Sequence, residues 1–313
     1  MSRGASELTS IIPGIVLCII LITGYRVSLR ADAFLAEDRV YYGADSYNIN
    51  YKDEIINGKG NAYFRKEGTS VRAREIVIYY GKNEKRAVFH RNVRIYDSER
   101  NYELRGDYGE AYYGDEYVAV QGNVIFIDDQ RKVTAGQGES RGMKSFTFTE
   151  DVLFIDEGVT VQSQTLEVQP DETALFRDDV HVVFTESGDD LYCDALTYLI
   201  ETGDSECRGN VIYMQKGSEE GEEEPFVVKS EMAQFFSESN LFLLMDGVYV
   251  TNGRYSFTAP IVKYFRERRV IESVGETVIK DSIRTVYCDR MVLDLNENKI
   301  TFFGTIQGVF NLE

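Results

Sequence analysis

A short phrase of sequence, Gln-Gly-Asn-Val-Ile-Phe-Ile-Asp at residues 121–128, recurs along this chain in altered form and constrains the fold more than any other feature. Aligned on Val124, the equivalent residues follow one another at steps of 28 to 37 residues. A period near 30 residues indicates a repeat architecture, in which one structural unit is used several times. The aligned positions are Val93, Val124, Val152, Val180, Val211, Val248, Val278 and, with the weakest match, Ile306.

The residues around each aligned position share their chemistry. The two residues before it are often Gly, Asn or Asp, as in Gly122 and Asn123, and these types tolerate the conformations that turn a chain. The residue four positions before it is apolar in all eight repeats, and the residue two positions after it is apolar or aromatic in the first six. These positions share one parity, so they lie on one face of an extended chain. The pattern predicts a corner followed by a strand with one apolar face.

The composition agrees with a fold made of paired strands. Hydrophobic residues make up 43% of the 313 residues, which is enough to bury a sizeable core. Tyr and Phe are abundant and only four Pro are present, as expected where aromatic side chains suit pleated surfaces and Pro removes a backbone donor. We therefore predict an all-β fold, an elongated stack of antiparallel strands. Residues 37–157 and 158–313 are expected to form one continuous stack.

The first 36 residues contain an apolar run of a different kind. Residues 8–25 carry no charge, and as a helix they would measure about 27 Å, just enough to cross a bilayer core. We expect one N-terminal apolar helix that anchors the chain in a membrane; a cleaved signal, with Ala31-Asp32-Ala33 as the processing site, is the alternative. The basic residues that follow the run outnumber Arg3 before it, and by the positive-inside rule this favours a cytoplasmic C-terminal part.

The charge distribution excludes some partners. A net charge of −18 argues against nucleic-acid binding, which needs a basic surface. Residues 59–105 are an exception, because they hold twelve Lys or Arg against six Asp or Glu. This basic segment is either a solvated strand face or a site for an anionic group.

No catalytic, metal or cofactor site is predicted. Gly138-Glu139-Ser140-Arg141-Gly142 matches the letters of a hydrolase nucleophile turn, but it lies in a β repeat rather than between a strand and a helix. The chain has only two histidines, His90 and His181, and neither has a metal-ligand neighbour at a suitable spacing. A hydrolase that uses Ser140 is kept as a minor hypothesis, and we expect the protein not to be an enzyme.

Three cysteines lie within the repeats. Cys193 and Cys207 are placed in successive strands, where a disulfide would be feasible, but the spacing leaves this open and two buried free thiols are the favoured alternative. Cys288 would then be unpaired in either case.

The repeat resembles that of the OstA-like proteins of lipopolysaccharide transport, the family that includes LptA. The resemblance is clearest at residues 102–128 and 193–214. In both, a stretch that contains Asp and Tyr precedes a Gly-Asn-Val corner. It implies a stacked, open β-jellyroll in the periplasm with an apolar groove for the acyl chains of lipopolysaccharide. An N-terminal anchor on such a fold is similar to the inner-membrane component LptC, and the transport components of the inner and outer membranes are the implied partners.

The aligned apolar face supplies candidate groove residues for lipopolysaccharide or a related lipid. The alternative is a filled core, in which case the chain would be a structural scaffold for protein contacts in the cell envelope. The predicted groove residues are Phe89, Val93, Ile95, Val120, Val124, Phe126, Phe148, Val152, Phe154, Phe176, Val180, Val182, Val211, Leu244 and Val248.

Two further contacts are predicted from the same picture. Arg72, Arg74, Arg91 and Arg94 of the basic segment are candidate ligands for the anionic head group, because Arg holds phosphate through a bidentate fork. Unpaired sheet edges at both ends of the stack would allow head-to-tail self-association by strand pairing.

Overall fold

Within residues 40–66, 68–81, 85–112, 116–142, 144–216 and 225–310, which the computed structural model describes, every regular element is a β-strand. The chain divides into two compact units, Met1–Arg39 and Val40–Glu313, and all of the described residues belong to the second. The predicted all-β class is therefore confirmed. The apolar run at residues 8–25 lies outside the described residues, and within them no helix has the length and hydropathy to span a bilayer.

Twenty strands make up the second unit. The odd-numbered strands are β1 (Val40–Gly43), β3 (Ile55–Lys66), β5 (Arg86–Asp97), β7 (Tyr117–Ile127), β9 (Ser145–Asp156), β11 (Thr173–Phe184), β13 (Ser205–Met214), β15 (Leu241–Thr251), β17 (Val270–Lys280) and β19 (Lys299–Phe303). The even-numbered strands are β2 (Ser46–Asn50), β4 (Thr69–Tyr79), β6 (Tyr102–Tyr112), β8 (Lys132–Arg141), β10 (Val159–Val168), β12 (Asp190–Leu199), β14 (Val227–Phe236), β16 (Ser256–Phe265), β18 (Arg284–Asp294) and β20 (Gln307–Phe310).

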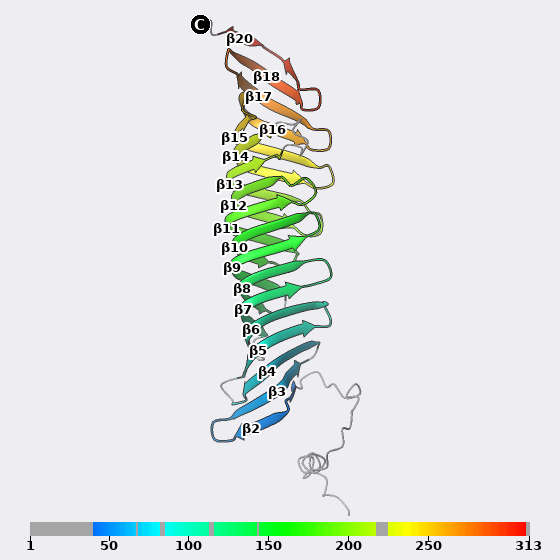
Figure 1. Cartoon of the computed structure of the whole chain (residues 1–313), viewed down its shortest axis with the longest axis vertical. Helices are drawn as coiled ribbons and strands as arrows, with labels where there is room; N and C mark the ends of the chain where they lie inside the picture. The colour runs from blue at the N-terminus through cyan, green and yellow to red at the C-terminus, as the bar shows by residue number, and fades with distance from the viewer. Residues whose placement is uncertain are drawn as a thin grey trace, which may run out of the picture. The chain divides into compact units, whose positions relative to one another are not determined.

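The strands form one antiparallel meander. From β3 to β18, each strand pairs with the one before it and the one after it, so the sheet grows along a single direction (Figure 1). β9 and β10 pair across residue 157, where the two predicted stretches of repeats meet. β1 and β2 both pair with β3 at one end, and β19 and β20 both pair with β18 at the other.

The corners predicted from the repeat are present in the odd-numbered strands. In β7, Gly122 and Asn123 have φ values of 73° and 49°, in the left-handed region. Gly122 also approaches the preceding strand closely, since a Cβ there would lie 2.9 Å from Asp107 Oδ2. The Asn123 side chain donates a hydrogen bond to that carboxylate at 2.7 Å, and Asn210 donates to Asp194 in the same way at 2.9 Å. The Gly-Asn pair therefore turns one strand and ties it to its neighbour.

The even-numbered strands also bend in the middle, beside the corners of the odd-numbered strands, but they bend in a different way. In β12 the buried residues switch parity between Cys193 and Leu196, and the pairing with β13 shifts register at this point. Each long strand is thus bent in the middle, and its two halves belong to two half-sheets whose apolar faces meet. The turns that follow even-numbered strands form one free border, here rim A, and those that follow odd-numbered strands form the other, rim B.

One continuous core fills the space between the half-sheets. It extends from Ile56 in β3 to Leu293 in β18, and aromatic rings from the two halves touch within it. Phe154 and Phe176, for example, have ring centroids 5.3 Å apart. Because each buried methylene contributes about 0.8 kcal/mol, this core is the main source of stability.

The aligned position Val278 was assigned wrongly, one residue too late. In β17 the corner is at Gly275, whose φ is 89°, and the interior position is taken by Thr277, which is fully buried. The Thr277 hydroxyl lies 2.7 Å from Ser273 Oγ and donates to the Gly275 carbonyl at 2.8 Å. These bonds satisfy the hydroxyl inside the core, so a polar residue occupies a position where the sequence pattern required an apolar one. Val274, expected inside, is 39% exposed.

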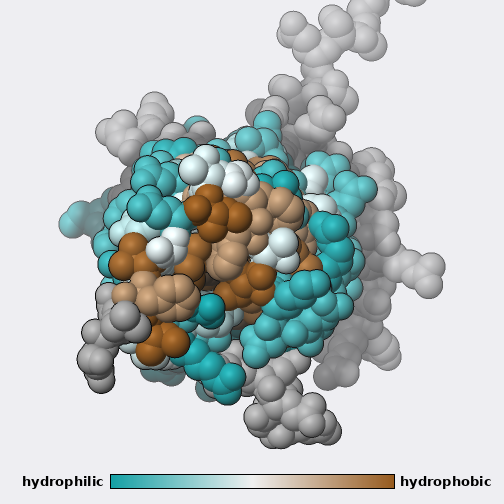
Figure 2. Space-filling model, turned by 90° about the horizontal axis from the view of Figure 1, so that it is seen from above, coloured by the Kyte–Doolittle hydropathy of each residue, from teal (hydrophilic) through white to brown (hydrophobic). Residues whose placement is uncertain are grey.

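The two ends of the meander leave edge strands with apolar side chains. At the β20 end, Phe303, Ile306, Val309 and Phe310 are between 43% and 66% exposed. Figure 2 views this end and shows hydrophobic residues gathered at its centre within a largely hydrophilic ring. The last aligned position, Ile306, follows a corner at Gly304 as predicted, and it is 55% exposed next to β20, the last strand of the described residues.

We expect residues 37–313 to fold without the N-terminal segment. Each strand from β4 to β17 is paired with its nearest neighbours in sequence alone, and in such architectures the stability is a sum of local terms. Far-ultraviolet circular dichroism of this fragment should show a spectrum dominated by strand. A spectrum dominated by helix, or an unfolded one, would contradict the expectation.

Candidate functional site

The two rims face each other along the unit, and the opening between them, here the mouth, is the place where a ligand can reach the core. Rim A contributes turns such as residues 141–145, and rim B contributes turns such as residues 97–102. The mouth is hollowed in the N-terminal half of the stack and bridged by side chains in the C-terminal half.

A cavity of about 670 Å³ opens at the mouth between β6 and the turn after β12. Its walls are rich in aromatic rings, from Tyr102, Phe126, Phe146, Phe148 and Phe154. Such a volume lies within the range of ordinary ligand pockets, which are mostly apolar with a few polar groups at defined places. We refer to this cavity as the aromatic hollow.

The bent strands bring these rings together from both half-sheets. Tyr102 begins β6 at rim B, whereas Phe146 lies near the start of β9 at rim A, and their ring centroids are 5.1 Å apart. Phe126 lies 5.4 Å from Tyr102 and 5.1 Å from Phe146. Burial, together with the nearby charge of Asp97, raises the pKa of the Tyr102 phenol, so the ring presents a neutral surface at physiological pH.

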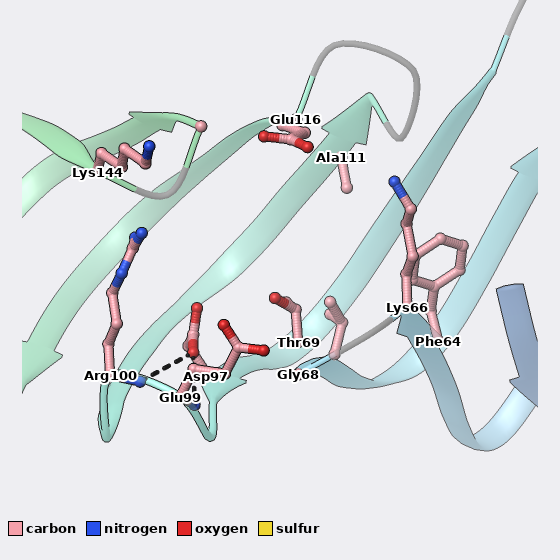
Figure 3. Close-up of a pocket in the computed structure, with 12 residues that line it drawn as sticks. Phe64, Lys66, Gly68, Thr69, Asp97, Glu99, Arg100, Ala111, Glu116 and Lys144 are labelled. Carbon is pink, nitrogen blue, oxygen red and sulfur yellow. Dashed lines mark hydrogen bonds between the residues drawn. The ribbon is translucent and has the colours of Figure 1, made fainter. Parts of the chain in front are cut away.

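A second, smaller cavity continues the hollow toward β3. It has a volume of about 250 Å³ and shares Arg100 and Lys144 with the aromatic hollow. Figure 3 shows Lys144 and Glu116 on one side of this cavity and Arg100 on the other, with the turn that carries Asp97 and Glu99 beside Arg100. The boundary between the two cavities is therefore marked by a cation from each rim.

The carboxylate of Asp97 is engaged by its own turn rather than by these cations. It accepts hydrogen bonds from the backbone N–H groups of Glu99 at 2.9 Å and Arg100 at 3.1 Å (Figure 3). Asp97 is buried, and this turn fixes where the Arg100 side chain leaves rim B. The entrance thus combines an aromatic interior with a border of mixed charge, in which Asp128, Arg131 and Glu172 join Arg100 and Lys144.

Toward the C-terminus the mouth is closed by Arg266. This residue of rim A reaches across to rim B, where it donates to Ser187 Oγ at 2.6 Å and Asp189 Oδ2 at 3.3 Å. Its guanidinium carbon lies 4.8 Å from the ring centroid of Phe184, so the charge also covers an aromatic side chain of the core. Asp189 accepts a further bond of 2.7 Å from the Tyr213 hydroxyl, and burial raises the pKa of that phenol well above its usual value.

A second bridge crosses the mouth beside the aromatic hollow. The Tyr198 hydroxyl of β12 donates to Asp156 Oδ2 of rim B at 3.1 Å. Ile200, two residues further on, lines the hollow, so this bond lies near its C-terminal limit.

Comparison with solved structures finds 12 chains of similar form. One of them is LptH from Pseudomonas aeruginosa, described as the LptA-homologous periplasmic component of the conserved lipopolysaccharide transport device. The match has 14% sequence identity, covers 46% of this chain and 81% of LptH, and has a TM-score of 0.26. No family model matches the chain, and no curated protein matches it.

The predicted groove residues all lie within the unit's interior, but only three of them line the hollow. Phe126, Phe148 and Phe154 contribute to its wall, and Phe126 is partly exposed. The others, including Val124 and Val180 at 1% exposure each, are covered by packed neighbours. For most of the length the aligned apolar face is therefore a filled core in this structure.

The predicted head-group arginines lie outside the mouth. Arg72, Arg74 and Arg94 are exposed on the outer face, and Arg91 occupies the corner of β5 with a φ of 64°. Arg91 is also 3.6 Å from Glu75 in an exposed ion pair. Sequence reasoning missed Arg100 and Lys144, which do stand at the mouth. Both residues lie in turns between strands. The alignment of the repeats used only the corners within the strands, so it did not point to these turns.

The residues considered for chemistry are scattered. Ser140 is buried, and its hydroxyl donates to the Ser145 carbonyl at 2.8 Å, closing a turn of rim A. His90 stacks edge-on against Tyr108, and His181 contacts Asp190 at 2.9 Å. Among the described residues, no cluster of His, Cys, Asp or Glu has the arrangement of a metal site.

The cysteines of the repeats are buried free thiols. Cys193 and Cys207 face each other in adjacent strands, and a hydrogen bond between them, followed by burial, raises the pKa of Cys207. Of the two alternatives that the sequence left open, the structure has the free thiols.

Proposed function

We propose that the protein takes acyl chains of lipopolysaccharide or a related lipid into the aromatic hollow and helps to carry the lipid across the periplasm to the outer membrane. The observation that carries the proposal is the hollow itself: an apolar cavity open at the mouth, with Arg100 and Lys144 at its border. Apolar walls favour acyl chains, and cations beside the entrance favour the anionic groups that such lipids carry near their chains.

The resemblance of the repeat to the OstA-like proteins points in the same direction. An LptA-like jellyroll, an inner-membrane anchor at residues 8–25 and partners in both membranes belong to this proposal. So does head-to-tail association, for which the edge strands β1, β2, β19 and β20 provide unpaired backbone groups. The role requires no bond-forming step, and we infer that the protein acts without catalysis.

A second candidate function is an envelope scaffold that binds proteins on its outer surface. It is favoured by the packing of the core, where residues such as Val120, Phe176 and Val248 have no exposure at all. On this alternative the aromatic hollow would hold no lipid. Mass spectrometry of lipids that copurify with the full chain after mild detergent extraction separates the two functions.

Filling the hollow provides a direct test in vitro. Val168 lies at the wall of the hollow at the rim A end of β10, and Val168→Trp should occupy the space without disturbing the packed core. Displacing two methylenes of a bound chain costs about 1.6 kcal/mol, so the affinity for a fluorescent fatty-acid probe should fall about tenfold. Fluorescence titration of the purified full chain measures this change.

Val159→Trp is the matched control. Val159 is at the other end of the same strand, is also partly buried against the core, and does not line the hollow. Its substitution should leave the affinity for the probe within about twofold of the original value, since the space for the chain is intact. Equal losses for both variants would show that the probe does not bind in the hollow.

A further inference from the structure

The outer face of β3 to β6 carries arginines in direct register. Arg72 pairs with Arg94 across β4 and β5, and Arg94 pairs with Arg105 across β5 and β6. The position beside Arg72 on β3 is Tyr63. Like charges directly opposite one another destabilise a sheet. This row of arginines therefore lowers the stability of the sheet unless anions lie beside it.

The chain itself supplies little negative charge to this row. Arg105 is held by Glu103 at 2.7 Å, and the hydrogen bond from Arg105, with a smaller contribution from Arg94, lowers the pKa of that carboxyl. Glu103 is therefore shared between two arginines. In the part of the chain that the structure describes, no ion pair is formed by Arg72 or Arg94.

A surface hollow of about 750 Å³ lies over the same residues. It is lined by Arg65, Arg72, Arg74 and Arg94 and by the half-exposed rings of Tyr63 and Tyr96, and we call these six residues the arginine face. Among the described residues that line it there is no Asp or Glu, although the chain has 52 acidic residues. A concave surface with many donors and no carboxylate is complementary to a compact anion.

We propose that the arginine face binds a phosphate-bearing ligand. Two guanidinium groups from adjacent strands can each offer a bidentate fork to phosphate oxygens, and the tyrosine hydroxyls can donate further bonds. The site is separate from the mouth, because Val71 and Ala73 on either side of Arg72 face the core while Arg72 faces outward. A lipid with its chains in the aromatic hollow cannot place its phosphates there through the sheet, so the inference goes beyond the proposed function.

Isothermal titration of the full chain in a non-ionic detergent tests the proposal with two probes. Sodium pyrophosphate represents a free phosphate compound, and monomeric dihexanoyl phosphatidic acid represents a lipid head group. We expect saturable binding that weakens as salt is added, and at low salt the double variant Arg72→Gln/Arg94→Gln should lose about tenfold or more in affinity. The probe that binds more tightly identifies the source of the phosphate.

The control is Arg177→Gln/Lys229→Gln, which removes the same charge from exposed positions on β11 and β14. Its affinity for both probes should match that of the original chain. An equal loss in this control, or no saturable binding of either probe, overturns the proposal. Binding of the fatty-acid probe in the aromatic hollow should be unchanged in both variants, so the outcome is independent of the test of the proposed function.

Discussion

Val124→Asp should lower the free energy of unfolding by about 4 kcal/mol, because it places a carboxylate without a partner in a packed core. Val124 is 1% exposed and faces the interior directly after the corner of β7. Urea unfolding followed by circular dichroism measures the change. In a meander stabilised by contacts between neighbouring strands, the loss of stability should be greatest for the repeats around β7.

Ile125→Asp is the matched control at the next residue. Ile125 is on the outer side of β7, only partly buried, and lies directly opposite Arg105 on β6. The new carboxylate would face a cation, so the free energy of unfolding should change by no more than about 1 kcal/mol. The reverse order of the two effects would mean that the interior and outer faces of this strand had been exchanged.

Arg266→Met should destabilise the C-terminal half of the unit by about 3 kcal/mol, since it leaves the Asp189 carboxylate buried without its cation. The side chains of Arg266 and Asp189 are 14% and 4% exposed. Thermal unfolding measures the loss of stability. Adding Asp189→Asn should restore part of it, because the neutral amide still accepts the hydrogen bond from Tyr213.

Arg268→Met provides the comparison on the same turn of rim A. Arg268 is exposed and lies over the ring of Phe265 at 4.1 Å, a contact that contributes about 0.5 to 1 kcal/mol at an exposed site. Similar losses of stability for the two arginine variants would contradict the view that Arg266 holds the rims together.

The sequence predicted the side that faces inward for the odd-numbered strands from β5 to β15, because its signals are local. A corner residue such as Asn123 must adopt a left-handed conformation, and Val120 and Val124 on either side of it share a parity. The even-numbered strands gave no such signal. Their parity changes at the bend, as between Ala135 and Gly138 in β8, so a single alternating pattern does not describe them.

Whether the interior is open or filled did not follow from the pattern. Parity tells which side chains point inward, but the distance between two half-sheets depends on how the side chains from opposite strands interlock. The aromatic hollow exists where Tyr102 of β6, Phe126 of β7 and Phe146 of β9 meet across the unit, and neither Tyr102 nor Phe146 is among the aligned positions of the repeat. Thr277 was missed because its hydroxyl is satisfied by partners that only the folded corner supplies.

Because the strands follow one another in a meander, the length of the unit is set by the number of repeats. Each strand adds about 4.8 Å along the stack, so each bent pair of strands adds about 10 Å without altering the cross-section. Removal of residues 124–151 would join Asn123 to Val152, preserving the corner and the alternation of the rims. Loss of a single strand would instead bring the next turn to the wrong rim, so changes in span come in steps of a whole repeat.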